Sequence, residues 1–268
     1  MQSDAKPRVG RSPWQVTLDV WHALFMREIG ARITQDRFGW SWLFLEPILH
    51  IVIMIGIREL LGRIRFIPNV EFIPYLIVGL LSFFVFRTAL MRSLGAINAS
   101  RGLFAYRQIQ PVDTVLVRCM VELILKSMVF LVFIWGAHAL GYTILPFNPL
   151  YAFYFWLGLW LLGTGLGLVL SVLTAIIPEA EKIISMAMFP LYFLSGVLIP
   201  LQFLPHSLHP YLLWNPIPHY IEHIRFMFFE HYQSLDGLNV LYPALWTVSS
   251  LLLGLMLHLA FKNRIKAQ

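Results

Sequence analysis

Six apolar segments follow one another along the chain, separated by shorter polar stretches. They span about residues 40–60, 72–97, 114–142, 150–177, 183–204 and 240–262. A helix needs about 20 apolar residues to cross the ~30 Å hydrocarbon layer of a bilayer, and each segment is of this order of length. The pattern therefore predicts an all-α membrane protein. We expect six transmembrane helices in one domain over residues 40–262, preceded by residues 1–39 and followed by a short tail, 263–268.

Residues 13–39 lie before the first apolar segment and have a different pattern. Their large apolar residues recur at helical spacing: Trp14, Leu18, Trp21, Leu24 and Phe25. Such spacing places apolar side chains on one face and predicts an amphipathic helix along the inner leaflet, with tryptophans at the level of the lipid headgroups. A short helix packed against the transmembrane bundle is the alternative.

The stretch between the fifth and sixth apolar segments is rich in proline. Its prolines are Pro200, Pro205, Pro210, Pro216 and Pro218. Proline at this density breaks helices into short pieces, yet residues 196–222 remain apolar. Non-helical backbone at membrane depth persists only where protein or a water-filled cavity covers it. The sequence predicts re-entrant half-helices over residues 196–222, on the outer side, with a merely hydrophobic outer loop as the alternative.

The composition agrees with a membrane protein and not with a nucleic-acid-binding one. Hydrophobic residues make up 58% of the chain and charged residues 13%, whereas soluble domains carry roughly a quarter charged residues. The net charge of +6 comes from lysines and arginines that lie between the apolar segments and at the two ends. They are frequent in residues 1–39, 98–113 and 262–268, and rare in 143–149 and 202–239. This asymmetry predicts cytoplasmic termini, with Arg63 and Arg65 as the one contrary indication.

Motifs for catalysis are not found. The chain lacks the phosphate-binding pattern G-x-x-x-x-G-K-[ST], and the glycines of residues 163–167 lie within an apolar segment, where small residues allow close helix packing. The single cysteine, Cys119, excludes disulfide frameworks and cysteine metal sites. His219 and His223 are one helical turn apart, a spacing that resembles half of a metal site, but no second pair completes it, and polar histidines at the membrane interface are the default interpretation. We predict no catalytic residue and no metal on this chain.

Charged residues inside apolar segments are costly and therefore informative. Those that we single out are Glu46, Arg87, Arg92, Arg118, Glu122 and Lys126. The last three are four residues apart, which allows a ladder of ion pairs along one helix. Pairing between helices, with Glu46 close in depth to Arg87 or Arg92, is the alternative. A functional interpretation is a cavity polar enough for a charged or sugar-containing substrate, and both interpretations can hold together.

The residues 27–49, REIGARITQDRFGWSWLFLEPIL, resemble the signature that opens the transmembrane subunits of polysaccharide ABC exporters. The matching residues are Arg27, Glu28, Arg32, Gly39, Trp42 and Pro47. Residues 98–118 are similar to the first cytoplasmic coupling segment of that family, and residues 194–225 carry its S-G-x-x-x-P and N-P-x-x-x-x-I-E-x-x-R patterns. Residues 176–183 also match, although Pro178 and Glu179 stand where the family has an Arg-Asp pair.

This resemblance covers nearly the whole chain and implies the membrane-spanning permease of a type-two ABC exporter. The chain looks most like the capsular polysaccharide branch, which moves lipid-linked polymer across the bacterial inner membrane; the O-antigen and teichoic-acid branches are alternatives. The resemblance implies a homodimer bound to two copies of a cytoplasmic ABC ATPase. That ATPase would bind ATP and magnesium, so no cofactor is expected on this chain. The resemblance also implies a periplasmic co-polymerase-like adaptor and an outer-membrane export protein.

Site residues follow from the same resemblance and from the chemistry of a polysaccharide. The residues that we assign to ATPase coupling are Phe104, Tyr106, Arg107, Glu179 and Glu181. Arginines can bind the acidic head of a lipid-linked chain, and aromatic rings can stack on sugars. The residues that we assign to the substrate path are Arg87, Arg92, Phe83, Tyr151, Tyr154 and Trp156.

Two other classes of protein compete with this interpretation. A membrane-embedded glycosyl or lipid transferase would need acidic residues in a water-facing loop, where Glu222, Glu230 and Asp236 are sparse and form no pattern. A proton- or sodium-coupled transporter would usually have internal repeats, and none is apparent between the two halves of the chain.

Overall fold

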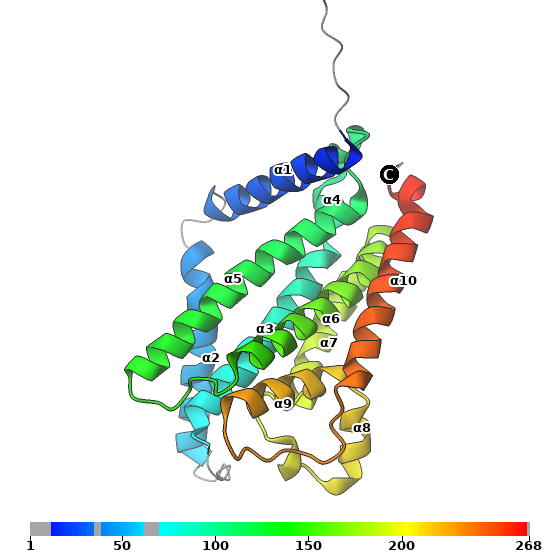
Figure 1. Cartoon of the computed structure of the whole chain (residues 1–268). Helices are drawn as coiled ribbons and strands as arrows, with labels where there is room; N and C mark the ends of the chain where they lie inside the picture. The colour runs from blue at the N-terminus through cyan, green and yellow to red at the C-terminus, as the bar shows by residue number, and fades with distance from the viewer. Residues whose placement is uncertain (1–11, 35–38, 62–69, 267–268) are drawn as a thin grey trace, which may run out of the picture.

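The protein is mainly helical in a computed structural model, which describes residues 12–34, 39–61 and 70–266 (Figure 1). No strand occurs among these residues, so the predicted all-α class is confirmed. The long helices are α1 (Pro13–Thr34), α2 (Gly39–Leu61), α3 (Phe72–Leu94), α5 (Pro111–Ala139), α6 (Pro149–Ile176), α7 (Ala180–Leu194) and α10 (Leu241–Lys266). The short helices are α4 (Ala96–Ala99), η1 (Arg101–Ala105), η2 (Leu201–Phe203), η3 (His206–Leu208), α8 (His209–Leu213) and α9 (Pro216–Phe228). The basic residues of the orientation argument that lie outside the described residues are Lys6, Arg8, Arg11, Arg37, Arg63 and Arg65.

Three of the described helices are long and apolar enough to cross a membrane, namely α3, α6 and α10. They correspond to the second, fourth and sixth predicted segments. Helix α2 contains a shorter apolar stretch, Ser41–Ile57, and charged residues interrupt α5. The six-span topology therefore stays a prediction for α2, α5 and α7.

The fifth predicted segment, 183–204, is wrong at its C-terminal end, because α7 ends at Leu194. Gly196 follows with φ +67°, a left-handed conformation that glycine adopts without steric cost. The predicted breakage into short pieces is confirmed: Pro200 and Pro205 precede η2 and η3, and a proline occupies the first turn of both α8 and α9. At these positions the missing N–H of proline costs no helical hydrogen bond.

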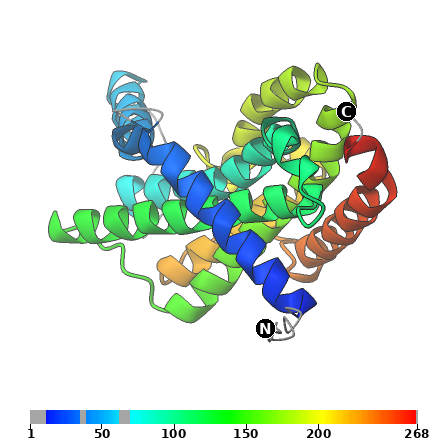
Figure 2. The same cartoon turned by 90° about the horizontal axis from the view of Figure 1, so that it is seen from above.

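Helix α3 forms the centre of the bundle, and its side chains are buried along most of its length. Helices α5 and α6 pack against it, and α10 packs against α6. Helix α1 crosses one end of the bundle over α5 (Figure 2), and α9 lies across α6 at the opposite end (Figure 1). We call these the α1 end, which also contains α4, η1 and the last turn of α10, and the α9 end, which also contains residues 140–148 and the short helices between α7 and α9.

Glycines in α6 bring it close to both of its neighbours. A Cβ on Gly163 would lie 2.6 Å from the Phe86 carbonyl oxygen of α3. A Cβ on Gly167 would meet Ser93 of the same helix, and one on Gly165 would meet Ser250 of α10. Since the obstructing atom at Gly163 belongs to the backbone, a side chain there would push α3 and α6 apart. The predicted packing role of residues 163–167 is confirmed.

Substitution of Gly163 tests this close approach. We expect Gly163→Ala to lower the free energy of unfolding by about 1–3 kcal/mol, as overpacking of a filled interior does. The measurement is thermal unfolding in detergent with a thiol-reactive dye, which reports exposure of the buried Cys119. Gly56→Ala is the matched control, because nothing lies within 4 Å of a Cβ at Gly56. Equal melting temperatures for the two variants would contradict the packing role.

Candidate functional site

The charged residues of α5 pair with neighbouring helices. The Arg118 Nε lies 3.1 Å from Glu28 Oε1 of α1, and the Lys126 Nζ lies 3.9 Å from Glu46 Oε2 of α2. Among the described residues, no ion pair joins Arg118, Glu122 and Lys126 to one another, so the predicted ladder along the helix is wrong. Helices α1 and α2 present opposite charges to this face of α5, and pairing across the contact satisfies groups that would otherwise be buried alone.

Glu122 forms ion pairs with two arginines, one from α1 and one from α3. Its side chain is 2% exposed, forms an ion pair with Arg32 of α1, and lies 3.4 Å from the Arg92 Nε of α3. Burial and, to a lesser degree, the charge of Arg92 lower the pKa of Arg32 to about 10, so Arg32 stays protonated at neutral pH. Glu122 thus ties α1, α3 and α5 together.

The predicted proximity of Glu46 and Arg87 is confirmed, since their side chains lie 3.2 Å apart. Arg92 pairs with Glu122 and not with Glu46. The Phe84 ring lies beneath two of the cations, with Lys126 Nζ at 5.4 Å and Arg87 Cζ at 5.9 Å from its centroid, within the range of cation–π attraction.

These groups form what we call the charge cluster. Its members are Glu28, Arg32, Glu46, Arg87, Arg92, Arg118, Glu122 and Lys126. Five cations face three carboxylates, so positive charge is in excess. The two most exposed side chains of the cluster are both cations: Arg87 is 42% exposed and Arg92 is 49% exposed. The cluster therefore presents positive charge on the surface of an otherwise apolar bundle, a setting in which guanidinium groups bind phosphate or carboxylate.

The four aromatic residues assigned to the substrate path occupy two different environments. Phe83 is buried against Tyr192, with the ring centroids 5.2 Å apart. Trp156 is buried and stacks on Phe130 at 4.3 Å. Within this chain these two residues belong to the core, because their side chains are almost completely buried. Their burial does not support a direct contact with a passing polymer, and their assignment to the path stays a prediction.

Tyr151 and Tyr154 are exposed on the first turns of α6. They can contact a sugar, so their assignment stays a prediction. The sequence offered no indication of this division, because all four aromatic residues lie among apolar neighbours in predicted transmembrane segments.

The first assigned coupling segment follows η1. Tyr106 is 61% exposed, and Arg107 is also exposed. Phe104 is buried in the same cluster as Ile97 and Val115, so its ring anchors the segment to the bundle. Its burial does not support a direct contact with the ATPase, and its assignment to coupling stays a prediction. Burial of one aromatic residue within a short 3-10 helix depends on the helices beneath it, which the local sequence does not specify.

The second assigned coupling segment is the turn between α6 and α7, where Glu179 and Glu181 are exposed. Thr174, just before this turn, donates a 2.7 Å hydrogen bond to the Leu94 carbonyl, just before α4 and η1. The Lys266 Nζ of α10 donates to the Ile109 carbonyl at 2.7 Å. Both assigned segments thus lie at the α1 end, beside the end of α10 (Figure 1).

Helix α1 packs on α5, as the alternative interpretation of residues 13–39 predicted. Val20 and Leu24 are buried against Val117, and the Trp21 indole N–H donates to Asp113 Oδ1 at 2.9 Å. A groove of about 390 Å³ separates α1 from the coupling segment after η1. The residues that line it include Val16, Asp19, Ala23, Arg27, Leu103 and Gln108. Sequence reasoning missed this groove, since its two walls are about 80 residues apart in the chain.

A second buried charge pair lies at the α9 end. Arg225 and Glu222 of α9 are completely buried and lie 2.6 Å apart. Arg225 also donates to the carbonyls of Gly196 and Val197, at 2.8 and 3.0 Å, and its guanidinium lies 3.6 Å from the centroid of the Tyr75 ring of α3. The connection after α7 is therefore held against α3 and α9.

Further contacts complete this arrangement. The Tyr232 hydroxyl donates to Glu222 Oε2 at 2.7 Å, and the Tyr75 hydroxyl donates to the Gly196 carbonyl at 3.3 Å. A Cβ on Gly79 would collide with the Arg225 guanidinium, so only glycine leaves room for it. We call the set the outer latch: Tyr75, Gly79, Gly196, Val197, Glu222, Arg225 and Tyr232. The E-x-x-R and S-G patterns of the sequence meet in it, a role that sequence reasoning did not anticipate.

The histidines considered as half of a metal site are engaged elsewhere. The Asn239 N–H donates to His219 Nδ1 at 3.0 Å, so Nε2 carries the proton and donates to the Leu213 carbonyl at 2.9 Å. His223 Nδ1 bonds to the His219 carbonyl. Within the described residues, no group of three histidine, cysteine or acidic side chains is placed to hold a metal ion.

Comparison with known proteins decides the family. The model of the ABC-2 type transporter family matches residues 20–229, more than half of the chain. The chain belongs to this family. The match includes the charge cluster, both assigned coupling segments and the outer latch as far as Arg225, and it ends directly after α9.

Proteins named for the transport of polysialic acid or the export of capsule polysaccharide are similar to this chain over nearly its whole length. The polysialic acid transport protein KpsM of Escherichia coli is 35% identical over 252 residues, which cover 93% of this chain and 96% of KpsM. The capsule polysaccharide export inner-membrane protein CtrC of Neisseria meningitidis serogroup A is 27% identical over 246 residues, 92% of each chain. BexB of Haemophilus influenzae, with the same description, is 26% identical over 253 residues, 93% of each chain.

Proposed function

We propose that this chain is the membrane-spanning subunit of an ATP-driven exporter that moves lipid-linked capsular polysaccharide across the bacterial inner membrane. The observation that carries the proposal is full-length similarity to relatives that are named for capsule or polysialic acid export. Their names favour the capsular branch over the O-antigen and teichoic-acid branches. The same similarity favours a transport subunit over a membrane-embedded transferase.

In the proposed topology, α2, α3, α5, α6, α7 and α10 are the six spans, and both termini are cytoplasmic. The α1 end then faces the cytoplasm and the α9 end faces outward. Helix α7 has 15 residues and is about 23 Å long at 1.5 Å per residue, less than the ~30 Å of the hydrocarbon layer. The short helices from η2 to α9 fill the remaining depth as re-entrant pieces, and the outer latch supplies the protein contacts that such backbone requires.

In this proposal, a partner ATPase binds ATP and magnesium, and its hydrolysis of ATP drives transport. This chain itself is proposed to carry no cofactor. We propose a homodimer with two copies of that ATPase, a periplasmic co-polymerase-like adaptor and an outer-membrane export protein. The ATPase would contact the exposed Tyr106 and Arg107, the exposed Glu179 and Glu181, and the groove beside α1. Their location at one end of the bundle supports this assignment.

Removal of the exposed coupling side chains tests the ATPase contact. We expect Tyr106→Ala combined with Arg107→Ala to lower ATP-dependent export about tenfold, because aromatic and arginine side chains contribute most to interface affinity. The measurement is surface polysaccharide at equal levels of the membrane-inserted chain. Tyr211→Ala is the matched control, since Tyr211 is 65% exposed at the α9 end. Unchanged export and unchanged stimulation of ATPase activity in the double variant would reject the assignment.

The exposed arginines of the charge cluster are proposed to meet the acidic head of the lipid-linked chain. We expect Arg87→Gln or Arg92→Gln to lower export about tenfold, because each removes one charge-assisted contact to an anionic group. The amount of folded chain in the membrane should fall by less. The measurement compares exported polysaccharide with the amount of folded chain in the membrane. Arg264→Gln, at an exposed arginine of α10, controls for general charge. Parallel loss of export and protein would indicate a structural role.

Reconstitution tests the proposed function as a whole. We expect the chain to purify with an ATPase in a complex of two copies each, and we expect vesicles that contain the complex to move capsular glycolipid only when ATP is supplied. Mass spectrometry of the purified complex would identify the bound glycolipid. The proposal fails if the isolated chain moves or modifies the glycolipid in vesicles without any ATPase.

A further inference from the structure

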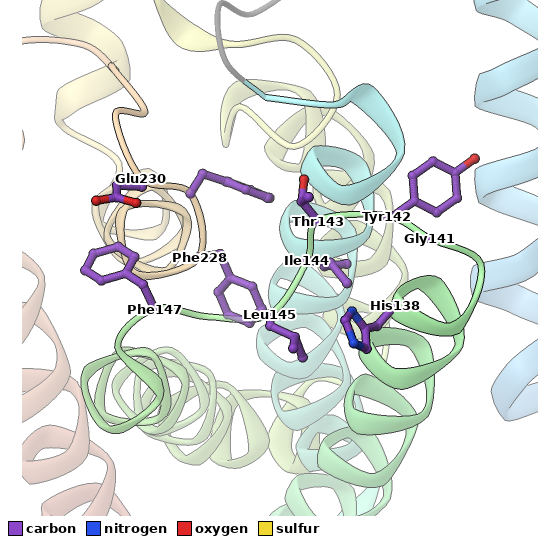
Figure 3. Close-up of a pocket in the computed structure, with 10 residues that line it drawn as sticks. His138, Gly141, Tyr142, Thr143, Ile144, Leu145, Phe147, Phe228 and Glu230 are labelled. Atoms are coloured by element: carbon purple, nitrogen blue, oxygen red, sulfur yellow. The ribbon is translucent and has the colours of Figure 1, made fainter.

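A cavity of about 500 Å³ opens at the α9 end, and no residue of the charge cluster or of the two coupling segments is among those that line it (Figure 3). Its walls are the last turn of α5, residues 140–147, and the end of α9. The residues that line it include His138, Thr143, Leu145, Phe147, Phe228 and Glu230. Its volume lies within the ~300–1,000 Å³ of small-molecule sites.

The walls of this cavity are fixed by the fold without any ligand. Gly141 turns the chain at φ +93°, and the Tyr142 N–H closes the turn on the Ala137 carbonyl at 3.1 Å. Ile144 is fully buried and anchors the middle of the segment. The Asn148 N–H donates to the Met227 carbonyl at 3.3 Å and joins the segment to α9. A preformed site avoids the entropic cost of ordering its walls when a ligand binds.

Polar groups surround an apolar floor in this cavity. Figure 3 places Phe147 and Glu230 on one side and His138 across from them, with Phe228 and Leu145 between. Over the described part of the chain, no hydrogen bond reaches the side chains of His138, Thr143 or Glu230. These three groups therefore retain their full capacity to bind a ligand: carboxylate oxygens accept, and the hydroxyl and imidazole donate or accept.

This combination fits a sugar better than a lipid headgroup. A pyranose presents apolar C–H faces to aromatic rings and hydroxyl groups around its edge to carboxylate, imidazole and hydroxyl partners. Among the described residues, no lysine or arginine lines the cavity, and Glu230 would repel a phosphate. Phe147 is 57% exposed, so part of its ring surface is available for contact with a sugar.

We propose that this cavity is a saccharide-binding subsite that holds one or two sugar units of the polymer as it leaves the bundle on the outer side. This inference rests on the proposed function and on the outward orientation of the α9 end. The subsite would contact the polymer after it has crossed the membrane. Weak binding of this part of the polymer would favour its outward movement over its return into the bundle.

Cysteine protection in living cells tests the subsite with the native polymer as the probe. Cys119 is the single cysteine of the sequence and is buried, so Thr143→Cys introduces the accessible thiol. Its labelling by a membrane-impermeant maleimide is compared in capsule-producing cells and in cells that lack the polymerising glycosyltransferase. Only the unoccupied subsite exposes the thiol. If the polymer is present at four times its dissociation constant for the subsite, the rate of labelling falls about fivefold. Ser207→Cys, at an exposed serine of the α9 end outside the cavity, should react equally in both strains.

The outcomes separate the subsite from the function. Equal labelling of Thr143→Cys in both strains, with capsule still exported through this chain, overturns the subsite and leaves the proposed function intact. Protection that depends on the adaptor and not on the polymer also overturns it, because the occupant is then a protein. As a second measurement, Phe147→Ala should slow the appearance of surface polymer, whereas Phe153→Ala, at a similarly exposed phenylalanine of α6 outside the cavity, should not. Capsule export that persists without this chain refutes the proposed function itself.

Discussion

Arg225→Leu is expected to lower the free energy of unfolding by about 3–5 kcal/mol, the usual result when one partner of a buried ion pair is removed. The substitution leaves the completely buried Glu222 carboxylate without its counter-charge. It also removes the hydrogen bonds to the Gly196 and Val197 carbonyls and the contact with the Tyr75 ring. The connection after α7 would then lose its attachment to α3 and α9.

The measurement is thermal unfolding in detergent together with the amount of chain inserted in the membrane. The double variant Glu222→Gln with Arg225→Leu should recover part of the stability, because it removes the uncompensated charge. Arg264→Leu, at an exposed arginine, should melt as the wild type does. An Arg225→Leu variant with wild-type stability would show that the outer latch does not hold the α9 end together.

Glu122→Gln is expected to have the second largest effect, a loss of about 2–3 kcal/mol. Glu122 is buried and binds Arg32 and Arg92, so its neutralisation leaves two cations without their carboxylate. The loss is smaller than at Arg225, because Arg92 is half exposed and Arg32 is 20% exposed, and water can replace part of the lost interaction.

Hydrogen exchange locates the consequence of this substitution. We expect faster exchange of the α1 amides in Glu122→Gln, since Glu122 is one of the groups that fix α1 to the bundle, while α9 and α10 keep their wild-type rates. Glu179→Gln is the matched control, because Glu179 is exposed and forms no ion pair within the described residues. Unchanged exchange in α1 would mean that the apolar contact with Val117 and the Trp21 hydrogen bond suffice to hold it.

The sequence by itself determined the features that depend on local chemistry. Long apolar segments specified α3, α6 and α10, because a helix satisfies all its backbone hydrogen bonds within one segment, as the interior of a membrane requires. The five prolines after α7 specified the break into short helices, since proline lacks the N–H that a helix interior needs. The glycines of residues 163–167 marked the close contact of α6 with its neighbours. The four family patterns indicated an exporter subunit before any tertiary contact was known.

Only the tertiary structure decided which side chains meet. Spacing along α5 permitted ion pairs within that helix, but α1, α2 and α3 supply the partners of Arg118, Glu122 and Lys126. Likewise, Phe104 is buried while Tyr106, two residues later, is exposed. The physical reason is the same in both cases. Helical periodicity determines which side chains share a face of a helix. The residues that cover this face come from segments that are distant in the chain, so the local sequence does not specify them.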